Sequence, residues 1–251
     1  MHVGDPDWTL RYSRHLALPD FGAAGQGRLG RAGVMLVGMG GLGTPAAMYL
    51  ATSGIGRLLL NDFDRVDTSN LPRQVLYRDT DLGEAKVAAA AAALRGLNPA
   101  CEIETIDGRL DETQLQQTAA SVDLVVDGSD NFGTRFAINS ACVRVRRPLI
   151  SGAAVRYEGQ LTAFDSRDTA SPCYACLYPE RGEELESCRE NGVLAPLTGV
   201  IGSLMAVEAI KMLTGIGTSL VGRLLRVDAR SGEIRFTKLN RDPACPVCVQ
   251  R

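Results

Sequence analysis

Val34-Met35-Leu36-Val37-Gly38-Met39-Gly40-Gly41-Leu42-Gly43 is the stretch that decides the fold. An apolar run ends in a turn where Gly38, Gly40 and Gly43 have the G-x-G-x-x-G spacing, and residues 44–52 are typical of a helix. Such a turn brings backbone N–H groups to a phosphate at the positive end of the next helix. The motif by itself predicts a nucleotide site, and its usual ligand is NAD or FAD.

The composition bounds the class of protein. A chain of 251 residues with 45 % hydrophobic content is long enough for one large α/β domain. A net charge of −2 gives no general attraction to nucleic acid or anionic membrane. The first ten residues lack the basic start and apolar core of a signal peptide, and the apolar run at 193–207 is too short to span a bilayer. We therefore expect a cytoplasmic protein with no nucleic-acid and no membrane partner.

Apolar runs and helical patterns alternate in the first half of the chain. Strands are expected at 33–37, 57–62, 102–106, 122–127 and 148–151, and helices at 45–53, 82–97, 111–120 and 134–145. From residue 155 the pattern changes to the alternation of antiparallel strands, at 157–164, 224–228 and 234–239, around an apolar helix at 197–213. The sequence thus predicts an α/β, Rossmann-like doubly wound sheet, parallel at first, with an antiparallel C-terminal extension.

The expected division has three parts. Residues 1–32 form a helical arm, in which Gly22, Gly25 and Gly27 are expected to interrupt the helix. Residues 33–153 form the nucleotide-binding half, and residues 154–251 form the second half of the same domain.

Two Cys-x-x-Cys pairs, Cys173/Cys176 and Cys245/Cys248, are the most specific local signal. Four thiolates from two distant pairs suit tetrahedral Zn²⁺ and leave no open position for water, so one structural zinc per chain is expected. A redox motif or two disulfides are the alternatives, which a cytoplasmic chain disfavours.

Polar side chains follow the strands of the nucleotide-binding half. They are Asp62, Asp64, Asn70, Arg73, Lys86 and Asp130. Ligands of open α/β sheets bind at the carboxyl ends of strands, and two cations with an aspartate suit a triphosphate with Mg²⁺. Arg73 alone is also typical of a loop ion pair, and Lys86 alone of a solvated helix residue. A dehydrogenase needs neither cation, so the set favours ATP over a dinucleotide.

The sequence resembles the MoeB/ThiF family, adenylyltransferases related to the ubiquitin-activating enzymes. The resemblance covers nearly the whole chain, from Arg11-Tyr12-Ser13-Arg14 to Cys245-Pro246-Val247-Cys248. It is carried by the glycine stretch, Asp62-Phe63-Asp64, Ser69-Asn70-Leu71-Pro72-Arg73-Gln74, Lys86 and Asp130-Asn131. Two departures are Gly128-Ser129, where relatives usually have Cys-Thr, and Pro72, where a polar residue is usual.

The resemblance implies that the C-terminal glycine carboxylate of a ubiquitin-like sulfur-carrier protein attacks the α-phosphate of ATP and releases pyrophosphate. A carrier with a C-terminal Gly-Gly is expected, most simply the small subunit of molybdopterin synthase. The nucleotide would be bound by Gly38, Gly40, Gly41, Gly43, Asp62, Asp64, Ser69, Asn70, Leu71, Arg73, Lys86, Asp130 and Asn131. Among these, Asp62 would accept the ribose hydroxyls, Asp64 would bind the metal or orient Arg73, and Asp130 would hold Mg²⁺.

Two further catalytic residues are implied by the resemblance. Arg14 would reach the phosphates of a neighbouring subunit, which implies a homodimer. Cys188, in a polar stretch at 181–191, stands where some relatives form a covalent link to the carrier. A separate protein would donate the sulfur. Alternatives are the same chemistry on a thiamine-pathway or other carrier, with Cys188 forming a covalent link, and a non-catalytic nucleotide-binding adaptor.

Overall fold

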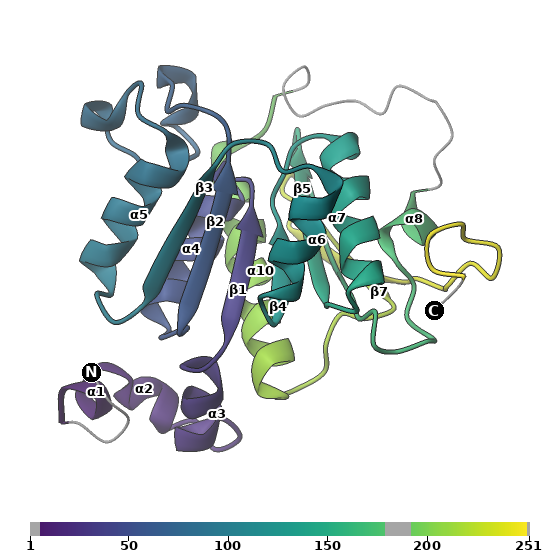
Figure 1. The fold of residues 1–251 in the computed structure, drawn as a ribbon, viewed down its shortest axis with the longest axis horizontal. Helices are drawn as coiled ribbons and strands as arrows, with labels where there is room; N and C mark the ends of the chain where they lie inside the picture. Colours follow the sequence, from purple (N-terminus) through teal and green to yellow (C-terminus); the bar gives the residue numbers. More distant parts are fainter. Residues whose placement is uncertain (1–5, 179–191, 250–251) are drawn as a thin grey trace.

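Eight strands form one sheet in the order β3-β2-β1-β4-β5-β6-β7-β8 (Figure 1). The computed structural model describes residues 6–178 and 192–249. The strands are β1 (Gly33–Val37), β2 (Arg57–Asp62), β3 (Glu102–Asp107), β4 (Leu124–Asp127), β5 (Leu149–Val155), β6 (Glu158–Phe164), β7 (Arg223–Asp228) and β8 (Glu233–Lys238). The five strands β1–β5 pair in parallel, and β6, β7 and β8 extend the sheet in antiparallel register. The expected fold class is confirmed.

Helices cover both faces of the sheet. One face carries α4 (Gly43–Thr52), α5 (Lys86–Leu97) and α10 (Ala195–Thr214), which pack on β1–β6 around one apolar core. The other face carries α6 (Glu112–Ala120) and α7 (Phe132–Arg144), which pack on a second core (Figure 1). Because alternate residues of a strand point to opposite faces, β1 sends Val34 and Leu36 to the first core and Met35 and Val37 to the second.

The N-terminal arm contains α1 (Pro6–Arg11), α2 (Ser13–Leu16) and α3 (Gly22–Leu29). It lies beyond the amino-terminal ends of β1 and β2, where the N–H of Gly56 donates to Leu29 O (Figure 1). The expected interruption of the helix is wrong at Gly25 and Gly27, which lie inside α3, whereas Gly22, with a φ of +51°, stands where α3 begins after a break. A Cβ atom at Gly25 would lie 2.8 Å from the ring of Phe21, so this glycine serves close packing.

Helix α5 begins later than expected. The prediction placed its start at residue 82, but the segment before Lys86 contains a 3₁₀ turn, η2 (Asp79–Asp81), and an isolated bridge between Arg65 and Ala85. The N–H of Val66 donates to Glu84 O, and Gly83 has a φ of +85°. These contacts hold residues 83–85 in a non-helical conformation, so that Lys86 becomes the first residue of the helix. Two other short elements are η1 (Thr68–Asn70) and α8 (Tyr174–Leu177).

Helix α10 is long and apolar enough to cross a membrane by length and composition. In the structure it instead packs against α4, β5 and β6, and half of its 18-residue apolar window is buried inside the protein. Glu208 on this helix is 2 % exposed and pairs with Lys211, with 2.6 Å between Oε2 and Nζ. We therefore assign α10 to the core.

The order of the parallel strands reverses between β1 and β4: the connections after β1 lead toward β2 and β3, and the connection after β4 leads toward β5. The chain runs from β1 through α4 to β2 on one face, and from β4 through α7 to β5 on the other. In open α/β sheets this reversal of strand order opens a crevice at the carboxyl edge. At this point the backbone is crowded: a Cβ at Gly43 would lie 1.8 Å from Gly38 O, and one at Gly38 would lie 2.9 Å from Gly128.

We predict that Gly43→Ala lowers the free energy of unfolding by about 3 kcal/mol, the upper end for overpacking, because the colliding atom is backbone and cannot rotate away. Gly40→Ala is the matched control. Its Cβ would meet nothing closer than Gln74 Nε2 at 3.7 Å, and a loss below about 1 kcal/mol is expected. Chemical denaturation without nucleotide measures both. Equal stability of the two variants would contradict the role assigned to the crowding.

Candidate functional site

A cavity of about 900 Å³ lies at the carboxyl edge of the sheet, at the switch point between β1 and β4. Its wall contains residues that follow β1, β2, β3 and β4 and residues at the start of α10. Helices α4, α5, α7 and α10 all begin at this cavity, since residues of each first turn or cap line it. The positive ends of four helix dipoles therefore face one space, which favours a polyanionic ligand.

The cavity brings together most of the predicted site residues. They are Gly38, Gly40, Gly41, Asp62, Asp64, Ser69, Asn70, Arg73, Lys86, Asp130 and Asn131. The lining does not include Gly43 or Leu71, and Gly43 instead permits the close approach of α4 to the end of β1. Packing against α10 also requires a glycine at position 41, which the sequence did not indicate. A Cβ there would lie 2.9 Å from Thr198 Oγ1 on α10.

Asp62 holds the glycine turn in place. Its Oδ2 accepts the N–H of Met39 at 2.7 Å, and its Oδ1 accepts the N–H of Asp64 at 2.8 Å. The Tyr77 hydroxyl donates to Met39 O at 2.8 Å from the other side. Burial raises the pKa of Tyr77 well above its usual range, so this donor keeps its proton. The turn is thus fixed before any ligand arrives, and Asp62 keeps lone pairs for further donors.

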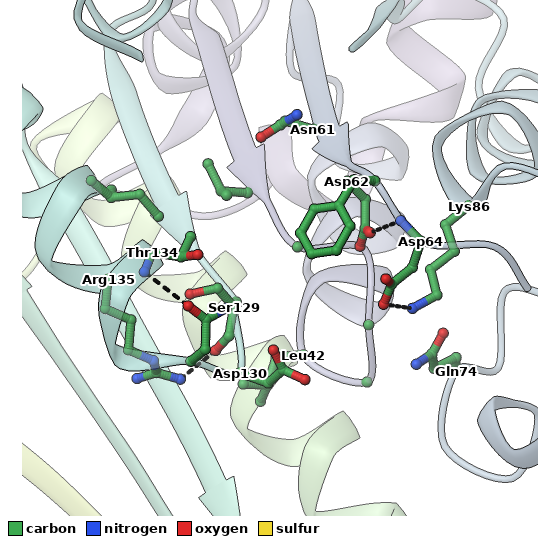
Figure 2. A pocket seen from close by; sticks show the side chains of 18 of the residues that line it. Leu42, Asn61, Asp62, Asp64, Gln74, Lys86, Ser129, Asp130, Thr134 and Arg135 are labelled. Carbon is green, nitrogen blue, oxygen red and sulfur yellow. Dashed lines mark hydrogen bonds and ion pairs between the residues drawn. The ribbon is translucent and has the colours of Figure 1, made fainter. Parts of the chain in front are cut away.

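Lys86 and Asp64 form an ion pair inside the wall. Lys86 Nζ lies 3.0 Å from Asp64 Oδ2, and the lysine side chain is only 6 % exposed (Figure 2). The alternative that Lys86 is a solvated helix residue is wrong. For Asp64, expected to bind the metal or to orient Arg73, the structure shows an ion pair with Lys86. A buried ammonium needs such a partner, because an unpaired buried charge is costly.

Arg73 is positioned by its own loop. Its Nη1 donates to Ser69 O at 2.8 Å, and its carbonyl accepts the Thr198 hydroxyl at 3.5 Å. Asp67 caps the η1 turn that precedes it by accepting the N–H of Ser69. The hydrogen bond from the Ser69 hydroxyl, then that from its N–H, lowers the pKa of Asp67, so the cap stays ionised at neutral pH.

The loop after β4 forms the opposite side of the cavity. Figure 2 shows Ser129, Asp130 and Arg135 there, across from Asp64 and Lys86. Asp127 is fully buried and accepts the hydroxyl of Ser129 at 2.6 Å and that of Ser151 at 3.1 Å. Arg135 donates to Ser129 O and Gly152 O. These bonds fix the loop while Asp130 stays exposed at the cavity.

Arg14, a predicted catalytic residue, does not line this cavity. Arg14 lies on α2, beyond the opposite edge of the sheet, so within one chain it is remote from the site (Figure 1). Cys188 falls outside the described residues.

Several lining residues were missed by the sequence analysis, among them Phe63, Gln74, Arg109, Leu110, Ser129, Thr134, Arg135 and Thr198. Phe63 and Gln74 adjoin predicted residues and could have been included on that ground. Thr198 had no sequence signal, because only the packing of α10 against α4 brings it to the glycine turn.

The four cysteines of the two Cys-x-x-Cys pairs come together beside α7. Their Sγ atoms all lie within 4.8 Å of one another, with 3.9 Å for Cys173–Cys176 and 3.6 Å for both Cys173–Cys245 and Cys176–Cys248. Tetrahedral zinc with Zn–S bonds of about 2.3 Å requires sulfurs about 3.8 Å apart, so the set fits the metal.

The surroundings of the cluster also suit bound thiolates. The amide of Asn139 donates to Cys173 Sγ at 3.6 Å, and the N–H of Asp242 donates to Cys176 Sγ at 3.4 Å. Hydrogen bonds from the Cys173 thiol first, and from backbone N–H groups, lower the pKa of Cys176 to about 4. Outer-shell donors of this kind orient metal ligands. The cluster joins α8 to the C-terminal segment at 245–248.

The fold and site define a nucleotide-binding enzyme of the Rossmann-like α/β class with a four-cysteine cluster. The chain belongs to the ThiF family, whose model matches residues 12–247. It is 46 % identical to the molybdopterin-synthase adenylyltransferase of Escherichia coli (strain K12), over 96 % of both chains. It is 44 % identical to the sulfur carrier protein adenylyltransferase of Thermus thermophilus, over 96 % of this chain and 92 % of that protein. By class the chain is therefore an adenylyltransferase.

Longer relatives and solved structures agree with this assignment. The adenylyltransferase and sulfurtransferase MOCS3-1 of Zea mays is 44 % identical over 96 % of this chain, which spans about half (52 %) of that relative. The structure of Escherichia coli MccB with ATP superposes with a TM-score of 0.83 at 27 % identity, covering 95 % of this chain and 74 % of MccB. ATP binding is thus seen in a protein of this fold.

We predict about one Zn²⁺ per chain by metal analysis. Cys176→Ser should lower this content severalfold, because a tetrahedral site loses one of its four thiolates. Cys142→Ala, in the core of α7, is the control and should keep its zinc. Chelation should expose the tail around 239–249 to proteolysis while ATP binding remains. A metal-free, fully folded wild-type protein would refute the assignment.

Proposed function

We propose that this protein adenylates the C-terminal glycine carboxylate of a ubiquitin-like sulfur-carrier protein with ATP and releases pyrophosphate. The observation that carries the proposal is the buried Lys86 at the start of α5, facing the same cavity as the glycine turn, Arg73 and Asp130. The names of the relatives supply the acceptor: the molybdopterin-synthase small subunit is the first candidate, and other sulfur carriers are the alternatives.

The carrier carboxylate is already a nucleophile, so the protein need not deprotonate it. The task is to hold two anions in line and to stabilise charge that develops on the phosphates. Backbone N–H groups of the glycine turn and the start of α4 face the phosphates. Arg73, Asn70 and Lys86 would neutralise the departing pyrophosphate, and Asp62 would accept the ribose hydroxyls.

Lys86 gains a second partner in this mechanism. Its Nζ lies 3.0 Å from Asp64 Oδ2. Because both side chains line the cavity, a phosphate oxygen can share the ammonium while Asp64 still orients it. Asp64 is thus a positioning residue for Lys86.

Asp130 is the proposed ligand of Mg²⁺. Mg²⁺ usually takes one or two carboxylates and completes its shell with substrate phosphates and water. A single exposed carboxylate beside a phosphate cradle fits this habit, and among the described residues the four cysteines are the only cluster of three or more potential ligands. Bound there, the ion would shield the charge of the phosphates.

We further propose a homodimer in which Arg14 of one chain reaches the cavity of the other. The position of Arg14 far from the cavity of its own chain supports this arrangement. We also propose that the C-terminal half, residues 154–251, binds the carrier and that a separate protein donates the sulfur. The proposed compartment is the cytoplasm.

In the alternative function Cys188 forms a covalent link to the carrier. Mass spectrometry after incubation with carrier and ATP tests this link.

The decisive test is ATP–pyrophosphate exchange that depends on a carrier with a Gly-Gly tail. We expect exchange with the cognate carrier and none with a carrier lacking its last glycine, because the acceptor carboxylate is then displaced from the phosphate. If the protein binds ATP but catalyses no exchange with any such carrier of the source genome, the remaining function is that of a non-catalytic nucleotide-binding adaptor.

Lys86→Met should lower exchange by about 10²–10³-fold, since it removes a cation from the developing charge and keeps the aliphatic stem. Lys211→Met is the matched control. It also removes a lysine paired to an acidic side chain, Glu208, but on the far part of α10. Its exchange per folded molecule should equal that of the wild type, although stability falls. Retained exchange in Lys86→Met would remove Lys86 from the phosphate site.

A further inference from the structure

The cavity has two chemically different ends. Ser69, Asn70, Arg73 and Lys86 line the polar end near the start of α5. The other end follows β2 and β3 and contains Phe63, Arg109, Leu110 and Leu115. Asp62 lies between them, and Figure 2 shows it between Asn61 on one side and Lys86 on the other. In a nucleotide the ribose separates base from phosphates, so an acid that takes the ribose leaves the β2–β3 end for the base.

At the β2–β3 end a cation stacks on an aromatic ring. The guanidinium carbon of Arg109 lies 3.9 Å from the centroid of the Phe63 ring. We call these two side chains the stacked pair. Phe63 is 39 % exposed and Arg109 is exposed, so the pair stands at the rim of the cavity with surface left for a ligand.

The backbone builds this pair. In the parallel register Asp62 is opposite Asp107, which places the residues that follow the two strands side by side. Asn61 then ties the strand ends together: its amide donates to Ile106 O at 3.0 Å and to Gly108 O at 2.8 Å. The N–H of Gly108 donates to Asp62 O at 3.2 Å. With a φ of +153°, Gly108 makes the turn that leads to Arg109 over the ring.

We propose that the stacked pair is the wall against which the nucleobase of ATP packs, and that it makes the site prefer purines; this rests on the proposed adenylyltransferase function. A planar guanidinium stacks on aromatic faces, and the ring beneath keeps it flat. Leu110, on the connection from β3 to α6, and Leu115, on α6 itself, add apolar surface at the same end. A purine offers more stacking area than a pyrimidine and gains more from such a wall.

A different role for Arg109 is a phosphate contact. The position argues against it, because Arg109 follows β3 while Arg73 and Lys86 stand at the polar end. The two roles predict opposite results: a base wall acts on adenosine, whereas a phosphate ligand acts on tripolyphosphate.

The test compares Arg109→Ala with Arg65→Ala in otherwise unchanged full-length protein. Arg65 is a fair control because it is an exposed arginine of the same edge, paired with Asp107 at 3.3 Å, and does not line the cavity. Affinities for ATP, adenosine and tripolyphosphate are measured by calorimetry, with competition for the weak ligands. Thermal melting of each variant shows that it is folded.

We expect Arg109→Ala to lower the affinities for ATP and for adenosine by the same factor, about tenfold, because one stacking partner of the base is lost. The affinity for tripolyphosphate should change less than twofold, and the preference for ATP over CTP should decrease. Arg65→Ala should change none of these values. Phe63→Ala combined with Arg109→Ala should lose less than the two single losses together, because both remove one wall.

Two results would overturn the inference: unchanged adenosine affinity in Arg109→Ala, or a loss confined to ATP and tripolyphosphate. Wild-type protein that binds ATP but catalyses no exchange would sink the proposed function and leave the base wall to be decided by the same affinities. Wild-type protein that binds no ATP would overturn both.

Discussion

The rest of the structure depends on the crowding of backbone where the chain leaves β1 and β4. Gly38, Gly43 and Gly128 meet there with no space for a side chain. Because the three backbones touch, α4 starts directly at the end of β1 and its first N–H groups open onto the cavity. The carboxylate of Asp62 and the hydroxyl of Tyr77 then fix the turn from two sides.

Electrostatics at the cavity follow from this arrangement. Four helices begin around one space, so their dipoles and the cations of the wall sum to a field for a polyanion. A free ammonium in such a field would be unstable, and Lys86 is 6 % exposed. The ion pair with Asp64 stabilises the buried ammonium, because a carboxylate lies 3.0 Å from it and keeps it at the wall of the cavity. The site is preorganised, and little must move when charge develops.

One helix carries residues of both chemical centres. Asn131, at the cavity, caps α7 by accepting the N–H of Thr134. Two turns further along, Asn139 accepts the N–H of Tyr174 at 2.9 Å and donates to Cys173. The cysteine cluster therefore fastens the C-terminal segment to the helix that forms one side of the cavity.

The sequence by itself determined the fold class and most of the wall. Local patterns were sufficient because a buried strand, a glycine turn and a helix start each have a signature within ten residues, as at Val34–Gly43 and at Cys173/Cys176. The errors concern contacts that lie outside such short patterns. Helix α3 packs against α10, and the late start of α5 at Lys86 depends on hydrogen bonds between residues 83–86 and the loop at Asp64 and Val66.

Only the tertiary structure decided which residues contact each other at the cavity. It paired Lys86 with Asp64, placed Thr198 of α10 so close to Gly41 that a Cβ there would collide with it, and left Arg14 at the opposite edge. It also put Arg109 over Phe63, through a register between two strands about 45 residues apart in sequence. Residue type and spacing specify which groups are available. Their partners are set by strand order and helix packing, which no local pattern contains.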